Sequence, residues 1–249
     1  MKFNLFIFSS LFLSFACIPL TVLIFLNARS RAHWLWGAFN IAVGVYGMGM
    51  LFVGISKTYD SAFFWWKVAI FGVANIGLFF FFTISEFTGI AQRKIWSSVV
   101  IIHGILFSIF TLGTNFVFNS LQFVFDDFYY YKAGMGWNIF FMIWMVIVIR
   151  AFILLYRFIQ QNKGFKATQA KYLFWGMLLG FTSGATASIP SWGFHVYPAC
   201  HFLVGVYAAI CTYAIFRYQL MDIRIAVTRL GVFFFFFSMV FGIPLFFGF

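Results

Sequence analysis

The stretch YAAICTYAIFRYQLMDIRIAVTRL, from Tyr207 to Leu230, gives the clearest indication of the fold. Its first half is apolar, and its second half carries charged side chains between apolar residues spaced three and four apart. This spacing, shown by Leu220, Ile223 and Val227, places the apolar side chains on one face of a helix. The stretch therefore predicts a membrane helix that leaves the bilayer and continues as a short cationic, amphipathic segment.

The composition of the whole chain indicates a polytopic helical membrane protein. Of its 249 residues, 64% are hydrophobic and 8% are charged, whereas soluble domains carry about a quarter charged residues. The formal net charge of +11 comes from basic residues that lie between hydrophobic stretches rather than on one face. Such a distribution indicates contact with membrane lipids and argues against nucleic acid as a partner.

Seven apolar stretches are long enough to form membrane helices. We expect these helices at residues 3–26, 34–55, 63–84, 95–117, 135–156, 172–189 and 199–216. A further apolar stretch, residues 231–249, is the expected start of an eighth helix. The predicted fold is an all-α, seven-transmembrane-helix bundle plus this eighth helix, and the segment 118–134 is expected to be an aromatic, acidic loop.

The distribution of basic residues predicts the orientation of the bundle. Most of them follow the first, third, fifth and seventh stretches: Arg29, Arg31, Arg93, Lys94, Arg157, Lys163, Lys166, Lys171, Arg217, Arg224 and Arg229. The other connections carry Lys57, Lys67 and Lys132. Because Lys and Arg are enriched in cytoplasmic loops, we expect the N-terminus outside and the cationic exit segment in the cytoplasm.

Few ionisable groups lie within the predicted helices, which disfavours a small transporter or channel, because such proteins usually need charges inside the membrane. Glu86 is the acidic residue closest to a helix interior, and two interpretations of it stay open. It either pairs with Arg93 or Lys94 at a helix end, or it holds the exit helix through Arg217.

Two connections on the predicted outer side carry the candidate residues for sensing a ligand. These residues are Asp126, Asp127, Trp192, His195 and Tyr197. One interpretation is an aromatic belt with a polar rim at the membrane surface. The other is a site in which aromatic rings cover an organic ligand, or in which two carboxylates and a histidine bind a divalent metal.

Cofactor chemistry is disfavoured by the placement of the histidines and lysines. Haem would need axial histidines on facing helices, whereas His103, His195 and His201 are expected at different depths. We expect His103 to be a core residue and the other two to be interfacial. The seventh stretch has no Lys that could form a Schiff base, which excludes retinal. The sequence predicts neither a metal nor a cofactor.

Glycines predict where helices approach one another closely. They are frequent in residues 34–55, and they recur at every fourth position as Gly176, Gly180 and Gly184. Small residues at this spacing let the backbones of two membrane helices come into contact. We therefore expect the sixth helix to pack tightly through this face.

Three segments carry a resemblance to a known family. They are Gln169-Ala-Lys-Tyr-Leu with Gly176 and Gly180, the loop 190–198, and the stretch YAIFRYQLMDIR at residues 213–224. Together they resemble the seven-helix membrane region at the N-terminus of certain bacterial sensor histidine kinases. In that family the closing helix typically ends in a Y-A-I-x-[RK]-Y-x-L-x-D-I-like stretch, which residues 213–223 match.

This resemblance implies a sensory input module that controls a cytoplasmic kinase, or another output such as a diguanylate cyclase, in cis or in trans. It implies a multi-pass protein of the bacterial inner membrane and a homodimer, with no catalytic residue in this chain. Glu86, Arg217, Asp222 and Arg224 are the candidates for signal coupling. A small transporter or channel and a membrane anchor subunit remain the alternatives.

The resemblance also suggests how the chain is divided. We expect a seven-helix sensor domain (1–217), a cationic exit segment (218–230) and the start of a further membrane helix (231–249). An apolar stretch where a cytoplasmic coiled coil is expected suggests a fragment of a longer protein.

Overall fold

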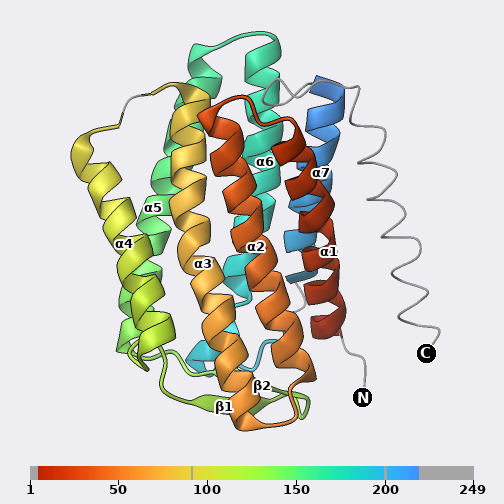
Figure 1. Ribbon diagram of the computed structural model, residues 1–249, viewed down its shortest axis with the longest axis vertical. Coiled ribbons are helices and arrows are strands. Elements are labelled where there is room, and N and C mark those ends of the chain that lie inside the picture. The colour runs from red at the N-terminus through yellow and green to blue at the C-terminus, as the bar shows by residue number, and fades with distance from the viewer. Residues whose placement is uncertain (1–4, 91, 199–200, 219–249) are drawn as a thin grey trace, which may run out of the picture.

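The computed structural model describes residues 5–90, 92–198 and 201–218 (Figure 1). This part of the chain contains seven α-helices: α1 (Leu5–Leu26), α2 (Arg31–Ile55), α3 (Tyr59–Thr88), α4 (Lys94–Gly113), α5 (Met135–Gln161), α6 (Phe165–Thr186) and α7 (Phe202–Tyr218). The first five are long and apolar enough to cross a membrane. The predicted eighth helix and most of the exit segment lie outside the described residues.

Several helices extend beyond the apolar stretches that predicted them. α2 begins at Arg31 and α3 continues to Thr88, so Arg31 and Glu86 belong to helices rather than to connections. α3 ends where Gly89 adopts a left-handed backbone with φ of 64°, a conformation that glycine adopts readily. The apolar stretch marks the hydrocarbon layer, whereas the helix continues until a capping residue interrupts its backbone hydrogen bonds.

Six helices form a closed ring. Around this ring α1 packs against α2, α2 against α3, α3 against α5, α5 against α6, α6 against α7, and α7 against α1. α4 lies outside the ring against α3 and α5, at one edge of the bundle (Figure 1). Ile102 and Ile105 on α4 are exposed, as expected for side chains that face lipid.

Glycines bring α2 and α3 into backbone contact, as the glycine-rich second stretch predicts. A Cβ atom added to Gly49 would lie 2.6 Å from the backbone nitrogen of Ala69. One added to Gly72 would lie 2.7 Å from the backbone nitrogen of Tyr46. Because no side chain fits at either position, these glycines set the separation of the two helices.

The helical fold class is confirmed, and the connection between α4 and α5, expected to be a loop, contains a short β-hairpin. Strand β1 (Leu121–Val124) pairs antiparallel with β2 (Phe128–Tyr131). Phe128 and Tyr130 are both buried, and they share one face because side chains alternate along a strand. In the turn, Phe125 and Asp126 have φ of 58° and 53°.

The hairpin closes one end of the ring. The indole of Trp66 on α3 donates a hydrogen bond of 2.9 Å to the Tyr129 carbonyl. Gln122 donates one of 2.8 Å to the Pro190 carbonyl, within a short 3₁₀ helix, η1 (Ile189–Trp192), that follows α6. The hairpin and η1 thus cover the end of the bundle drawn at the bottom of Figure 1, which we call the hairpin end.

Candidate functional site

A cavity of about 70 Å³ lies inside the ring, behind the hairpin. Its wall comes from five helices (α2, α3, α5, α6 and α7), from β2 and from the segment after α6. The wall is mainly aromatic and aliphatic, and its polar aromatic members include Tyr46, Trp66, Tyr131, Trp137, Trp144 and Tyr207. The position and chemistry of this cavity are those of a site for a small, largely apolar molecule.

α7 forms part of the cavity wall and packs on the glycine face of α6. Val204 and Tyr207 of α7 line the cavity. A Cβ atom added to Gly180 would lie 3.3 Å from Cβ of Tyr207, and one added to Gly176 would lie 3.1 Å from a methyl carbon of Ile210. The predicted close packing of the sixth helix is therefore confirmed, and its partner is α7.

Polar contacts connect α7 to α1 and α2. The hydroxyl of Tyr207 donates a hydrogen bond of 2.9 Å to Oδ1 of Asn40 on α2. The same hydroxyl lies 3.4 Å from Sγ of Cys17 on α1. All three residues are buried. Hydrogen bonds of this kind hold neighbouring membrane helices in register.

His201 is buried, so the expectation that it is interfacial was wrong. Its Nδ1 lies 3.0 Å from Oγ of Ser9 on α1, and its ring packs edge-on against Tyr46 at 5.4 Å between centroids. His201 precedes α7 directly, so this contact fixes the start of that helix against α1. No local pattern predicts this contact, because Ser9 and His201 are 192 residues apart in the chain.

Three of the five sensing candidates lie around Phe125 at the tip of the hairpin: Asp127, His195 and Tyr197. The ring of Phe125 lies 4.8 Å from that of His195 and 5.1 Å from that of Tyr197, between centroids. The backbone amide of Phe6 donates to the Tyr197 hydroxyl at 3.1 Å. Burial raises the pKa of Tyr197, and the negative charge of Asp127 raises it further. Tyr197 is therefore a neutral hydrogen-bonding group at neutral pH.

The other two candidates lie apart from this group. Asp126 is exposed in the hairpin turn, whereas the indole of Trp192 donates to Oδ1 of Asn138 on α5 at 2.8 Å. The cavity wall contains none of the five candidates. Across the described residues there is no group of three or more His, Cys, Asp or Glu side chains that could hold a metal ion. Their assignment to ligand sensing stays a prediction.

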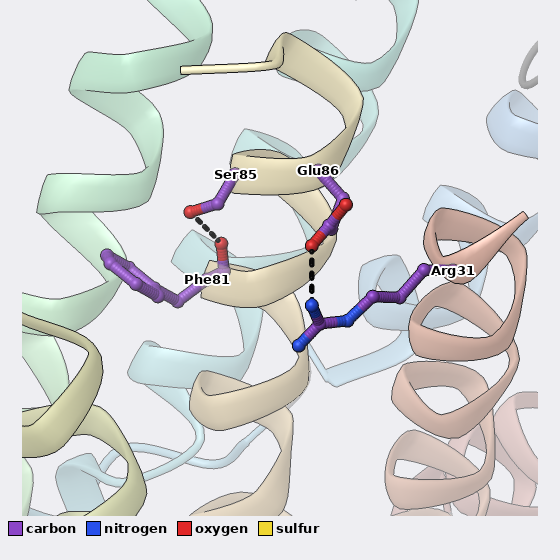
Figure 2. A network of polar contacts seen from close by, with 4 residues as sticks. All are labelled: Arg31, Phe81, Ser85 and Glu86. Carbon is purple, nitrogen blue, oxygen red and sulfur yellow. Dashed lines mark hydrogen bonds and ion pairs between the residues drawn. The ribbon is translucent and has the colours of Figure 1, made fainter. Parts of the chain in front are cut away.

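Glu86 forms an ion pair with Arg31 at the end of the bundle opposite the hairpin (Figure 2). Nη1 of Arg31 lies 3.3 Å from Oε1 of Glu86, so α2 and α3 are joined there. Figure 2 also shows Ser85, whose hydroxyl donates to the Phe81 carbonyl at 2.9 Å. A surface groove of about 280 Å³ includes this ion pair, and its lining residues include Arg31, Ser85, Glu86 and Gln92.

The ion pair with Arg31 contradicts the interpretation that Glu86 pairs with Arg93 or Lys94. Glu86 does not pair with Arg93 or Lys94, because α3 continues past Glu86 and presents it to the first turn of α2. The side chain of Arg217 and the residues Asp222 and Arg224 fall outside the described part of the chain. Signal coupling through these residues therefore stays a prediction.

Arg150 is a charged residue inside a membrane helix, and it was not among the candidates predicted from the sequence. It lies within α5, donates to Oε1 of Gln92 at 3.4 Å and stacks over Trp96 with 5.5 Å to the ring centroid. Its Nε is buried and makes no hydrogen bond to any described residue. A charge inside a membrane helix marks a functional position by default. A single Arg within residues 135–156 was the signal available in the sequence.

His103 is a core residue, as predicted. It is buried, its Nε2 lies 3.3 Å from the Phe140 carbonyl, and its ring stacks on Phe140 at 5.1 Å. One face of the imidazole is thus covered by an aromatic ring. This packing is typical of a histidine that is part of the helix interface.

Comparison with known proteins assigns the chain to a family. The family model for the N-terminal 7TM region of histidine kinase matches residues 9–224. No match is found among curated proteins or among solved structures. The match covers the six-helix ring, α4 and the hairpin, and it includes the exit segment through Arg224. This chain therefore belongs to the family of N-terminal seven-transmembrane regions of histidine kinases, the membrane sensory part of those proteins.

Proposed function

We propose that this chain is the input module of a bacterial two-component sensor histidine kinase, and that its signal passes through α7 and residues 218–230. The observation that carries the proposal is the position of α7. Val204 and Tyr207 line the internal cavity, while the last turn of the helix lies at the opposite end of the bundle. A molecule that occupies the cavity therefore acts directly on the helix that leads to the output.

The charge distribution supports an orientation with the N-terminus and the hairpin end outside a bacterial cytoplasmic membrane. The connections α1–α2, α3–α4 and α5–α6, together with the helix ends next to them, carry most of the basic residues outside the exit segment, and all three connections lie opposite the hairpin. Positive loops are retained in the cytoplasm. In this orientation the exit segment lies in the cytoplasm, where it contacts a kinase. That kinase is part of the same protein or a separate partner, and the protein acts as a homodimer.

The two flanks of α7 differ in a way that suits a signalling helix. Towards α6 it packs closely on a face of small residues, where Gly176 and Gly180 present no side chain to α7. Towards α1 and α2 it is held by the hydrogen-bonding contacts of Tyr207 with Cys17 and Asn40. A shift of α7 between two packed arrangements on α6 is the motion that we propose. Glu86, Arg217, Asp222 and Arg224 are proposed to hold the exit side of this movement.

Glycine-to-alanine variants of α6 in the full-length kinase test the proposal. Gly176→Ala and Gly180→Ala add a Cβ atom 3.1 and 3.3 Å from α7, whereas Gly113→Ala, at the end of α4, adds one that meets nothing within 4 Å. The first two should shift α7 and change autophosphorylation in membranes by at least about fivefold, the effect of about 1 kcal/mol on a two-state equilibrium. Gly113→Ala is the matched control, because Gly113 does not line the cavity, and it should behave as wild type. Wild-type phosphorylation by all three folded variants would refute signalling through this interface.

A further inference from the structure

We propose that the cavity binds a small, uncharged molecule that is apolar over most of its surface and carries one hydrogen-bond-accepting oxygen, such as a ketone or aldehyde. Trp137 and Tyr46 donate hydrogen bonds to that oxygen. This proposal names the class of ligand for the site and so rests on the proposed sensory function. It follows from how the polar groups around the cavity are used.

Most polar aromatic side chains in the cavity wall already have partners. The indole of Trp66 donates to the Tyr129 carbonyl at 2.9 Å, and that of Trp144 donates to the Val73 carbonyl at 3.0 Å. The Tyr207 hydroxyl is bonded to α2, as described above. The hairpin tyrosines are also occupied, because Tyr130 donates to the Ala187 carbonyl and Tyr131 interacts with the side chains of Ser188 and Ser191.

Two groups in the same wall have no such partner. Nε1 of Trp137 is buried and makes no hydrogen bond to any described residue. The hydroxyl of Tyr46 likewise makes no hydrogen bond within the described part of the chain, and the residue is only 8% exposed. Leaving a buried donor without an acceptor costs about 1–3 kcal/mol. Both residues line the cavity, so an acceptor inside it would satisfy them.

The two groups belong to one region of the wall. The rings of Trp137 and Tyr131 lie 4.8 Å apart between centroids. Tyr46 and Tyr131 line the same cavity as Trp137. A single oxygen between α2 and α5 can therefore accept from both donors, since a carbonyl oxygen has two lone pairs.

The size and lining of the cavity restrict the rest of the ligand. A volume of about 70 Å³ is room for about five to seven water molecules, or for one small ring of similar bulk. The surrounding Phe, Val, Ile and Met side chains offer no partner to a charge, and burying an unpaired charge is strongly unfavourable. A compact ketone such as cyclopentanone fits these requirements, and cyclopentane is its match without the oxygen.

Binding of this pair of probes tests the proposal. The 249-residue chain in lipid nanodiscs is titrated with cyclopentanone and with cyclopentane, and ligand-detected NMR measures dissociation constants after subtraction of partitioning into empty nanodiscs. We expect saturable binding with a preference for the ketone. Tyr46→Phe removes a donor and keeps the ring, whereas Trp137→Phe removes a donor together with the five-membered ring of the indole. Each should weaken ketone binding by about three- to tenfold, as expected for one buried hydrogen bond, and Tyr46→Phe should leave binding of cyclopentane unchanged.

Trp175→Phe is the matched control, because Trp175 is 64% exposed and does not line the cavity. It should bind both probes as wild type does. The proposal is overturned if cyclopentanone shows no saturable binding above empty nanodiscs, or if both donor variants bind it as tightly as wild type. Two separate donor variants keep the test decisive should one of them fail to fold.

The same ketone added to the full-length kinase separates this proposal from the sensory function. Ketone binding that depends on Trp137 and Tyr46 but leaves autophosphorylation unchanged supports the ligand class and counts against signalling from the cavity. A kinase whose activity responds to the α6 variants, but whose membrane region binds no ketone, counts against the ligand class alone.

Discussion

Gly49→Ala should destabilise the bundle through the contact between α2 and α3. The added Cβ atom would lie 2.6 Å from the backbone nitrogen and 2.7 Å from Cα of Ala69. Backbone atoms cannot rotate away as a flexible side chain can, so the two helices must separate by nearly an ångström to restore ordinary contact. Overpacking of this kind typically costs about 1–3 kcal/mol.

Gly44→Ala on the same helix provides the control for this prediction. Its added Cβ atom would meet only Cβ of Cys17, at 3.7 Å, an ordinary contact. Both variants gain the intrinsic preference of alanine over glycine in a helix, up to about 1 kcal/mol. We therefore expect Gly44→Ala to be neutral or stabilising, and the two variants to differ by about 1–3 kcal/mol in unfolding free energy.

The assay is equilibrium unfolding of the purified chain in mixed micelles, with helix content followed by circular dichroism as the fraction of denaturing detergent rises. Gly49→Ala should unfold at a lower fraction than wild type and Gly44→Ala should not. Equal unfolding midpoints for the two variants would refute the close α2–α3 contact. A loss of stability only in Gly44→Ala would instead indicate that α1 and α2 are the tightly packed pair.

Three further predictions concern polar contacts and use the same unfolding assay. Tyr207→Phe removes the hydrogen bond to Asn40 and should cost about 0.6–1.7 kcal/mol, the range measured between membrane helices; a double-mutant cycle with Asn40→Ala should recover this coupling. Glu86→Gln should cost less than about 1 kcal/mol, because its ion-pair partner is 73% exposed, and the difference from wild type should shrink in high salt. Arg150→Met should leave stability unchanged or raise it by about 1 kcal/mol, since it removes a partly buried charge that has no acidic partner among the described residues. A clear loss of stability in that variant would show that the contacts with Gln92 outweigh the cost of burying the charge.

The apolar stretches predicted the number and order of the described helices because their signal is local. About twenty consecutive apolar residues suffice to identify a membrane helix. The ends of the helices were not predictable in the same way. Glu86 was assigned to a connection, although α3 continues to Thr88, because the sequence shows where the hydrocarbon layer ends and not where a helix is capped.

Features that depend on contacts between distant segments escaped the sequence. The two strands that flank Phe125 have four residues each. So short a run shows too little alternation of apolar and polar residues to predict a strand, and its aromatic residues were assigned to a belt at the membrane surface. His201 was expected at the interface because it lies at the outer end of the seventh apolar stretch, yet it contacts Ser9 and Tyr46. The cavity is assembled from five helices and a strand, so neither its position nor its free donors Trp137 and Tyr46 could be read from local pattern.

The contacts of α7 make that helix a lever with unequal arms. Tyr207, held to α1 and α2, is the fulcrum. At a rise of about 1.5 Å per residue, the arm from Phe202 to Tyr207 is about 8 Å long and the arm from Tyr207 to Tyr218 is about 17 Å long. A rigid tilt about this point therefore moves the exit end about twice as far as the hairpin end, and in the opposite direction. A displacement beside the cavity would therefore be about doubled at Tyr218.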